Sequence, residues 1–278
     1  MTSKIFFAES LEALRVLPDS SVDLITTDPP FNTGVIQQDN RSKISYLDRR
    51  DDYIEWMHDV VKECHRVLVP NGAMYIHLNE KVSYKIRFLV MDDIFGESNW
   101  LNTIIWDFDY GGRSKKTFAR KHESVLYYAK NINDYTFHYD MIDRIPYMAP
   151  SLQKDIARRE AGKPVTDVWW CTICTTRGKE RVSYPNQKPL KLYERMIKVS
   201  SNPGDVILDP FAGSGTTCVA AARHGRRFIG IDRNEKAMHV MHDRFKIEGI
   251  EAVAWLDAQG NHVEIKESHN DTCEQSDE

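Results

Sequence analysis

The fold is decided by the stretch Asp205-Val206-Ile207-Leu208-Asp209-Pro210-Phe211-Ala212-Gly213-Ser214-Gly215-Thr216-Thr217-Cys218-Val219-Ala220-Ala221-Ala222-Arg223, which Arg227-Phe228-Ile229-Gly230-Ile231-Asp232 follows after a short turn. The apolar pattern predicts a strand over 205–209, a glycine-containing turn over 210–215 and a helix over 216–223. A second strand follows over 227–232. Strand, helix and strand in this order predict a βαβ unit, which belongs to a parallel sheet.

The turn of this unit suits a nucleoside ligand. Gly213 and Gly215 lack side chains, so the backbone can approach a ligand closely at the N-terminus of the helix. Asp232 stands where an acid can accept hydrogen bonds from both ribose hydroxyls. A dinucleotide fingerprint would need a third glycine where Cys218 stands, and no Gly-x-x-x-x-Gly-Lys phosphate loop is present. The sequence therefore favours a sulfonium-bearing adenosine over the nicotinamide dinucleotide of an oxidoreductase.

A second strand that ends in an acid lies near the N-terminus. Residues 22–27 are mostly β-branched and apolar, and Pro29 and Pro30 end the predicted strand abruptly. Asp28 therefore lies at the carboxyl end of a strand, where ligands bind in open α/β sheets, although Asp-Pro-Pro is also an ordinary turn. If the two strands flank the point at which strand order reverses, Asp28 lies beside the cofactor.

The rest of the chain alternates between strand and helix patterns, which predicts an α/β fold with helices on both faces of a largely parallel sheet. Residues 32–50 are polar and nearly aperiodic and predict a long mobile loop suited to a lid. Residues 131–180 are aromatic and basic without clear alternation. We interpret them as an insertion that supplies a second surface for phosphates and unstacked bases, with an irregular packed subdomain as the alternative. Further strands are predicted over 4–8, 73–78, 101–106 and 124–128, and further helices over 11–17, 51–68, 81–94 and 189–200.

Composition points to an ordinary globular chain of 278 residues with 41% apolar and 28% charged side chains. No apolar run approaches the ~20 residues of a membrane span, so no membrane partner is expected. Five cysteines at irregular spacings argue for a reducing interior, the cytoplasm. Cys171 and Cys174 form one Cys-x-x-Cys pair, but no second pair follows at zinc-site spacing, so no metal site is expected.

The distribution of charge is more informative than the net charge of −4. Residues 261–278 are acidic and predict a disordered tail. A basic cluster in one segment, offset by acid elsewhere, is compatible with binding a polyanion on one face, and a solvated loop is the alternative. The basic cluster consists of Arg113, Lys115, Lys116, Arg120 and Lys121.

Together these motifs resemble those of S-adenosylmethionine-dependent amino-methyltransferases that act on DNA. Asp28-Pro29-Pro30-Phe31 is similar to the catalytic motif and Asp209-Pro210-Phe211-Ala212-Gly213-Ser214-Gly215 to the cofactor motif. Tyr184-Pro185-Asn186-Gln187-Lys188-Pro189 is similar to a further cofactor-binding motif. Glu9-Ser10 and Lys121-His122-Glu123 also have counterparts, although the family usually has an aspartate near position 9. The order of the motifs resembles the permuted β class of adenine methyltransferases, and the resemblance covers residues 4–130 and 167–240.

The resemblance implies a doubly wound, mostly parallel, seven-stranded Rossmann-like sheet, circularly permuted. The catalytic domain would comprise residues 1–130 and 181–260, with target recognition in 131–180. The implied cofactor is S-adenosylmethionine, and no metal is required. The implied catalytic residues are Asp28, Pro29, Pro30 and Phe31. The implied cofactor-binding residues are Glu9, Asn186, Gln187, Lys188, Asp209, Pro210, Phe211, Ala212, Gly213, Ser214, Gly215 and Asp232.

The implied reaction is methyl transfer to the exocyclic N6 of adenine in double-stranded DNA, after base flipping. Asp28 and a backbone carbonyl, that of Pro29, would accept hydrogen bonds from the two amino protons, and Phe31 would stack on the base. The family is found in bacteria, archaea and phages, where it acts on nucleoid DNA, often as a homodimer or with a cognate restriction endonuclease.

Three other functions are alternatives to adenine methylation. Cytosine N4 methylation uses the same geometry, but its motif more often begins with serine than with an acid such as Asp28. Cytosine carbon 5 methylation needs a cysteine nucleophile after a proline, and none of the five cysteines follows one. A catalytically silent DNA-binding subunit remains the alternative from another class, against which the complete motifs argue.

Overall fold

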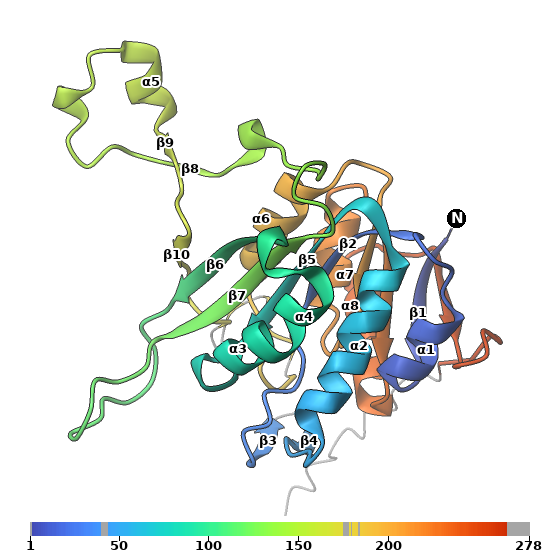
Figure 1. The fold of residues 1–278 in the computed structure, drawn as a ribbon. Coiled ribbons are helices and arrows are strands. Elements are labelled where there is room, and N and C mark those ends of the chain that lie inside the picture. Colours follow the sequence, from blue (N-terminus) through green and yellow to red (C-terminus); the bar gives the residue numbers. More distant parts are fainter. Residues whose placement is uncertain (1, 40–43, 175–177, 179, 183, 266–278) are drawn as a thin grey trace, which may run out of the picture.

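The computed structural model describes residues 2–39, 44–174, 178, 180–182 and 184–265. Its centre is a nine-stranded sheet in the order β10-β6-β7-β5-β2-β11-β12-β1-β13 (Figure 1). Neighbouring strands are parallel except at β7, which is antiparallel to both β5 and β6. The strands are β1 (Ser3–Phe7), β2 (Val22–Thr27), β5 (Leu68–Leu78), β6 (Trp100–Asp107), β7 (His122–Ala129), β10 (Val168–Trp170), β11 (Val206–Asp209), β12 (Arg227–Asp232) and β13 (Val253–Leu256).

The predicted mostly parallel α/β sheet is therefore confirmed, and the predicted strand over 22–27 coincides with β2. Within the described residues the central sheet has nine strands and not the expected seven. The difference comes from the edges, where the three-residue β10 pairs with β6 and the four-residue β13 pairs with β1.

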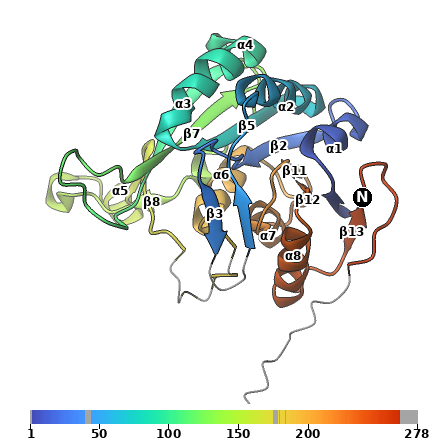
Figure 2. The ribbon, with the colours of Figure 1, turned by 90° about the horizontal axis from the view of Figure 1, so that it is seen from below.

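Helices cover both faces of the sheet and make three layers (Figure 2). Successive side chains of a strand point to opposite faces. In β5, Met74 and Ile76 accordingly pack in one core, and Ala73 and Tyr75 in the other. One face carries α1 (Ser10–Val16), α2 (Tyr53–Val67), α3 (Glu80–Ile86) and α4 (Asp92–Phe95), and the other carries α6 (Leu190–Ser200), α7 (Thr216–Arg223) and α8 (Glu235–Ile247).

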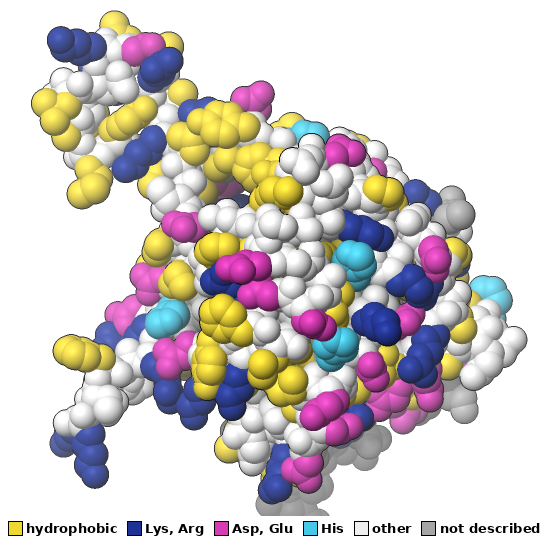
Figure 3. All heavy atoms as spheres, viewed as in Figure 1, with side chains coloured by type: hydrophobic (Ala, Val, Ile, Leu, Met, Phe, Trp, Pro, Cys, Tyr) yellow, Lys and Arg dark blue, Asp and Glu magenta, His cyan; other side chains and the backbone are white. Residues whose placement is uncertain are grey.

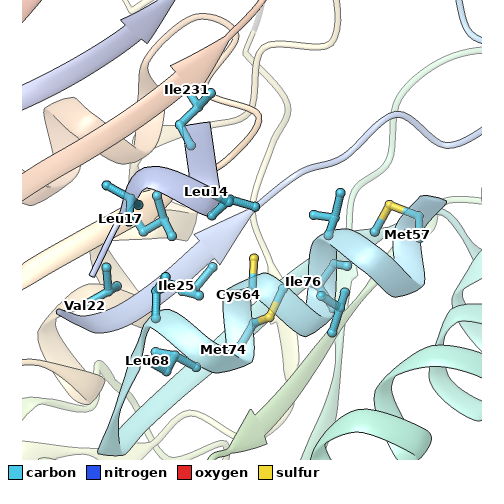
Figure 4. Packing of buried hydrophobic residues seen from close by; sticks show 14 of the residues in the cluster. Leu14, Leu17, Val22, Ile25, Met57, Cys64, Leu68, Met74, Ile76 and Ile231 are labelled. Atoms are coloured by element: carbon cyan, nitrogen blue, oxygen red, sulfur yellow. The ribbon is translucent and has the colours of Figure 1, made fainter. Parts of the chain in front are cut away.

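The long helix α2 buries one apolar stripe, as its three- and four-residue spacing predicts. Met57 and Cys64 of α2 meet Ile25 of β2 and Met74 of β5 in the first core (Figure 4). Burial of each large apolar side chain contributes about 1.5–3 kcal/mol. This packing fixes β2, and with it the residues that follow β2. The buried stripe is Tyr53, Trp56, Met57, Val60, Val61, Cys64 and Val67.

Two predicted segments differ from expectation. The segment 32–50 contains the antiparallel hairpin β3 (Ile36–Asp39) and β4 (Ile44–Leu47), while its residues 40–43 lie outside the described part. The prediction of a loop without strands was therefore wrong for these residues, because contacts at the base of the hairpin hold its two strands together, while the predicted mobility stays a prediction. There the carboxylate of Asp48 accepts hydrogen bonds from the backbone of Asn32 at 2.9 Å and Thr33 at 3.0 Å.

The predicted helix 81–94 is divided by a π-helical turn, η1 (Arg87–Met91), between α3 and α4, and the 3-10 turn η2 (Glu97–Asn99) follows. Ile86 and Phe95 are nine residues apart and would lie on opposite sides of a regular α-helix. The wider π turn changes this angle, and both side chains are buried. No helix within the described ranges is long and apolar enough to cross a membrane.

The predicted insertion 131–180 projects from the body over part of its length (Figure 1). Its base is held at the end of α6, where the backbone N–H of His138 donates to the carbonyl of Val199 at 2.7 Å. Its last strand, β10, belongs to the central sheet. The other elements are η3 (Tyr139–Met141), β8 (Arg144–Ile145), η4 (Pro150–Leu152), α5 (Ile156–Ala161) and β9 (Lys163–Pro164). Of the predicted tail 261–278, residues 266–278 lie outside the described part.

Candidate active site

Strands β2 and β11, far apart in sequence, are neighbours in the sheet. Leu24 pairs with Ile207, and Ile25 with Leu208. The chain runs from β2 through α2 to β5 on one side, and from β11 through α7 to β12 on the other. The strand order therefore reverses between β2 and β11, which is where open α/β sheets bind ligands. The predicted side-by-side placement of the two strand ends is confirmed.

A cavity of about 310 Å³ lies at these strand ends. It is lined by residues following β2, β11 and β12, by the end of β4 and the segment after it (46–50), by Tyr53 and Trp56 of α2, and by 184–188 before α6. Its size is within the range of small-molecule sites. Of the predicted site residues, those that line it are Glu9, Asp28, Pro29, Pro30, Phe31, Asn186, Gln187, Lys188, Asp209, Pro210, Phe211, Ala212, Gly213, Ser214 and Asp232.

Gly215 is the predicted cofactor residue outside this lining. Its φ is +72°, and a Cβ atom there would lie 2.9 Å from Cγ of Met241. Gly213 also has positive φ, +49°, and its added Cβ would meet the ring of Tyr184 at 3.1 Å. Both glycines therefore satisfy backbone conformation and packing. For Gly215 this packing is a second reason for glycine, and the approach of a ligand at this position stays a prediction.

Asp232 braces the turn after β11. One of its carboxylate oxygens, Oδ2, accepts from the backbone of Gly213 at 2.8 Å, and Oδ1 accepts from Asn234 at 2.8 Å. Each oxygen has a further lone pair that can face the cavity. Burial is the main influence on Asp232 and raises its pKa. At the same rim, Glu9 forms an ion pair with Arg233 at 2.5 Å.

The two oxygens of the Asp28 carboxylate have different surroundings. Oδ2 lies 3.4 Å from Nζ of Lys188. Oδ1 is buried and has no hydrogen-bond partner within the described residues. Burial is the largest influence on this group and raises the pKa of Asp28. A buried acceptor without a donor is costly in a protein, so Oδ1 is suited to a ligand that brings a donor.

Lys188 is held from two sides. Besides Asp28, its Nζ contacts Oε2 of Glu123 at 2.9 Å, and the same carboxylate oxygen lies 2.8 Å from Nε2 of His77. Lys188 was expected in a cofactor-binding motif, but its ammonium group contacts the predicted catalytic acid. His77, which no motif of the sequence singles out, is buried within this group.

The other two motif residues near Lys188 hold the loop before α6. The side-chain amide of Gln187 is used within the loop, accepting from the backbone of Val182 at 2.9 Å and donating to the carbonyl of Glu180 at 2.7 Å. Asn186 has φ of +54° and donates to the side chain of Gln37 at 3.1 Å. This contact links the loop to the β3–β4 hairpin.

Sequence reasoning missed residues of α2 that shape the cavity. The hydroxyl of Tyr53 donates to the carbonyl of Pro30 at 2.7 Å. The ring of Trp56 lies edge-on to Phe211, with 5.4 Å between the ring centroids. Both were predicted as members of an apolar core stripe. Two features of the sequence could have marked them as site residues. Both side chains carry a polar group, and both lie in the first turn of the helix that follows Asp28 and the segment 32–50.

The predicted basic cluster lies outside the cavity, on the loop 108–121 that joins β6 and β7 and projects from the body (Figures 1 and 3). Lys121 closes the base of this loop by donating to the carbonyl of Gly112 at 3.0 Å. Arg113 pairs with Asp109, and Arg120 with Glu80. Lys115 and Lys116 are exposed, and no ion pair of theirs occurs within the described residues. Among those residues, no group of three or more His, Cys, Asp or Glu could hold a metal ion.

The fold and this cavity define a class, the doubly wound α/β proteins that bind a ligand at the point where strand order reverses. The DNA methylase family model, which covers N6 and N4 methyltransferases, matches residues 22–243. The chain therefore belongs to the DNA methylase family. This confirms the predicted family and the predicted class of enzyme, an S-adenosylmethionine-dependent DNA methyltransferase.

Individual relatives agree with the family. The type II methyltransferase M.HpaI of Haemophilus parainfluenzae is 32% identical, over 89% of this chain and 76% of its own length. The DNA adenine methyltransferase YhdJ of Escherichia coli K12 is 34% identical, over 84% of this chain and 79% of its own length.

Solved structures share the fold. The cytosine-N4-specific PvuII DNA methyltransferase has a TM-score of 0.64 at 19% identity, covering 91% of this chain and 95% of its own. The M1.HpyAVI–SAM complex has a TM-score of 0.59 at 23% identity, covering 87% of this chain and 98% of its own. At these identities the likeness concerns the fold alone.

Proposed function

We propose that this protein transfers the methyl group of S-adenosylmethionine to the exocyclic N6 of adenine in duplex DNA, at specific sites. The observation that carries this proposal is the buried, unpartnered Oδ1 of Asp28, at the end of β2 beside the turn that follows β11. An amino group is the donor that this acceptor lacks. The adenine methyltransferase among the relatives, at 34% identity, supports adenine as the substrate.

The proposed role of Asp28 is to orient and polarise the amino group. The lone pair of an exocyclic adenine nitrogen is delocalised into the ring, so two acceptors that hold both amino protons favour a pyramidal, nucleophilic nitrogen. Oδ1 of Asp28 is the first acceptor. The carbonyl of Pro30 is already engaged by Tyr53, which supports the carbonyl of Pro29 as the second. Phe31, on the cavity wall, supplies an apolar face for the base.

The residues on the other side of the cavity suit the cofactor, which supplies an electrophilic methyl group on a sulfonium. The remaining lone pairs of Asp232 suit the ribose hydroxyls. Glu9, at the rim, suits a second polar group of the cofactor, and Asn186 and the turn 209–215 complete this side. Gln187 and Asp209 act by holding the loops, because their side chains are bonded to protein groups.

DNA is proposed to lie across the mouth of the cavity. The exposed ammonium groups of Lys115 and Lys116 on the loop 108–121 suit phosphates. The insertion 131–180 is proposed to contribute to recognition, and 1–130 with 181–260 to form the catalytic unit, in the permuted order of the β class. Extruding the base costs a few kcal/mol, which contacts in the cavity offset. A homodimer, a cognate restriction endonuclease and a place at the bacterial nucleoid belong to the same proposal.

Cytosine N4 methylation is the second candidate, because the PvuII enzyme shares the fold and an amino group is again the acceptor of the methyl group. The deciding experiment is incubation of the protein with unmodified genomic DNA and S-adenosylmethionine, followed by nucleoside mass spectrometry and mapping of modified sites. N6-methyladenine at a defined sequence is expected. N4-methylcytosine would establish the second candidate instead, and cofactor binding without any methylated base would identify a catalytically silent subunit.

A further inference from the structure

A row of four ionisable side chains runs inward from the cavity. Asp28, Lys188, Glu123 and His77 follow one another with closest distances of 3.4, 2.9 and 2.8 Å. They come from four segments: the end of β2, the loop before α6, β7 and β5. The side chains of Asp28 and Glu123 are 21% and 19% exposed, whereas those of Lys188 and His77 are 8% and 1% exposed, so the row leads from the cavity wall to a buried histidine.

Aromatic rings enclose this row. Nζ of Lys188 lies 4.9 Å from the ring centroid of Phe31 and 5.7 Å from that of Trp106. The ring of His77 is packed edge-on against Trp106, with 5.3 Å between centroids. These rings exclude water from the ammonium group and leave the two carboxylates as its ionic partners.

Stability alone does not account for this arrangement. A buried ammonium group loses its hydration, and ion pairs at such depth return little net free energy compared with apolar packing. The row does, however, constrain geometry. Lys188 engages only one oxygen of Asp28, and the other oxygen, Oδ1, remains without a partner within the described residues.

We infer that Lys188, Glu123 and His77 are positioning residues that fix the Asp28 carboxylate with Oδ2 bound to the ammonium group and Oδ1 free for the substrate amino group. Glu123 holds the ammonium group of Lys188 at 2.9 Å, and Nε2 of His77 lies 2.8 Å from the same oxygen of Glu123, although His77 makes no well-aligned hydrogen bond within the described residues. The inference rests on the proposed methyl transfer. It gives Lys188 the role of holding Asp28, whereas the resemblance implies that Lys188 belongs to a cofactor-binding motif.

This arrangement also fits the charge changes of the reaction. As the nitrogen–carbon bond forms, the carbon–sulfur bond breaks and its electron pair goes to sulfur, so the amino nitrogen becomes cationic and then loses a proton. Oδ1 of Asp28 accepts that proton, which passes to solvent when the product leaves. Lys188 stays protonated throughout. Burial opposes its charge, but Asp28 and Glu123 outweigh burial and raise the pKa of Lys188.

The row predicts opposite electrostatic effects of its members on Asp28. Burial, the largest influence, raises the pKa of Asp28, the ammonium of Lys188 lowers it, and the carboxylate of Glu123 raises it. The charge of His77, at the far end of the row, also lowers the pKa of Asp28. Besides burial, the charge of Asp28 raises the pKa of four nearby groups, Asp209, Tyr46, Tyr53 and Tyr193.

The test compares Lys188→Met and Glu123→Gln with wild type, using methyl transfer from labelled S-adenosylmethionine to unmodified genomic DNA. We expect kcat to fall on the order of 100-fold for Lys188→Met and about tenfold for Glu123→Gln, with the cofactor Kd within about threefold of wild type. The acid limb of the kcat profile should move to higher pH in Lys188→Met and to lower pH in Glu123→Gln. The double variant should be no slower than Lys188→Met, because the two residues act as one unit.

The matched control is Lys198→Met, which removes a 3.0 Å ion pair with Asp143 at the far end of α6 and should leave kcat and its pH profile unchanged. The inference would be overturned by a wild-type kcat for Lys188→Met. It would also be overturned if the acid limb of the kcat profile against pH moved in the same direction in the two single variants. If Lys188→Met does not fold, Glu123→Gln alone decides through the direction of its pH shift. Failure of the proposed function is distinct, since wild type itself would then methylate no DNA.

Discussion

Oγ1 of Thr27 donates a hydrogen bond to Oδ1 of Asp209 at 2.8 Å, which joins the last residues of β2 and β11. The same carboxylate also accepts from the hydroxyl of Thr217 at 2.6 Å and the backbone of Phe211 at 3.0 Å. Asp209 therefore links the strand that carries the catalytic motif to the strand, turn and helix of the cofactor motif. Together with the backbone pairing of β2 and β11, this buried carboxylate fixes the position of Asp28 relative to the turn after β11.

This carboxylate should make stability depend on pH. Burial raises the pKa of Asp209 from 3.8 to about 6, in spite of its hydrogen bonds. Because the folded state holds the proton more tightly, the stabilisation is complete below pH 4 and is lost as pH rises through about 6. The loss amounts to about 3 kcal/mol. In Asp209→Asn, we expect the free energy of unfolding, measured by urea titration, to lack this fall between pH 4 and 7.

Asp143→Asn is the control for the pH prediction, because it has the opposite sign. Burial would raise the pKa of Asp143, but Lys198 and Arg195 outweigh burial and lower it. Its stabilisation is present above the unfolded pKa and is lost as pH falls. If Asp209→Asn and wild type lose stability in parallel over pH 4 to 7, the buried carboxylate is not the cause.

Asp28, the proposed catalytic acid, should be required for turnover and not for cofactor binding. In Asp28→Ala the acceptor Oδ1 is removed while the turn after β11 is unchanged. We expect methyl transfer to fall at least 1000-fold, on the order of the loss of an essential catalytic group, and the Kd for S-adenosylmethionine to change little. Single-turnover methylation and calorimetry measure the two quantities.

Asp23→Asn is the matched control for Asp28, since Asp23 lies on β2, the strand that Asp28 follows, and accepts a hydrogen bond from the backbone of Val206 at 2.8 Å. It should retain turnover. Normal methylation by Asp28→Ala would show that the amino group is activated by another residue.

The parts of this fold that the sequence predicts are those that local pattern determines. Val22–Thr27 and Arg227–Asp232 were predicted to the residue, because apolar runs and the residues that stop them mark strands directly. The two acids at the strand ends could also be found, since the topology of such sheets brings strand ends together.

Other parts depend on contacts between distant residues. Lys188 meets Glu123 across 65 positions, and Glu123 meets His77 only because β7 runs antiparallel to β5. No local signal marks these pairs. The β3–β4 hairpin was missed for the same reason, since Asp48 and Asn186 hold a polar segment whose own pattern is weak.

The exposed lysines of the loop 108–121 should contribute to DNA binding without base specificity. Lys115→Gln with Lys116→Gln removes two charges that are available to phosphates. We expect weaker binding to all duplex sequences and a decrease of about 2 in the slope of log K against log salt concentration. Fluorescence anisotropy from 50 to 300 mM salt measures the slope. Lys62→Gln, on the exposed side of α2, is the control, and an unchanged slope in the double variant would place DNA on another surface.

The glycine at the N-terminus of α7 should be indispensable for stability, and a second glycine tests the reason. Gly215→Ala adds a Cβ at φ of +72° and 2.9 Å from Cγ of Met241, so it combines backbone strain with overpacking. We expect a loss of about 3 kcal/mol in the free energy of unfolding, measured by urea titration. Gly225→Ala has nearly the same φ, +71°, but its Cβ meets no atom within 4 Å. It should lose about 1 kcal/mol from strain alone. Equal losses in the two variants would mean that contact with Met241 contributes nothing, and that backbone conformation alone requires glycine in the cofactor loop.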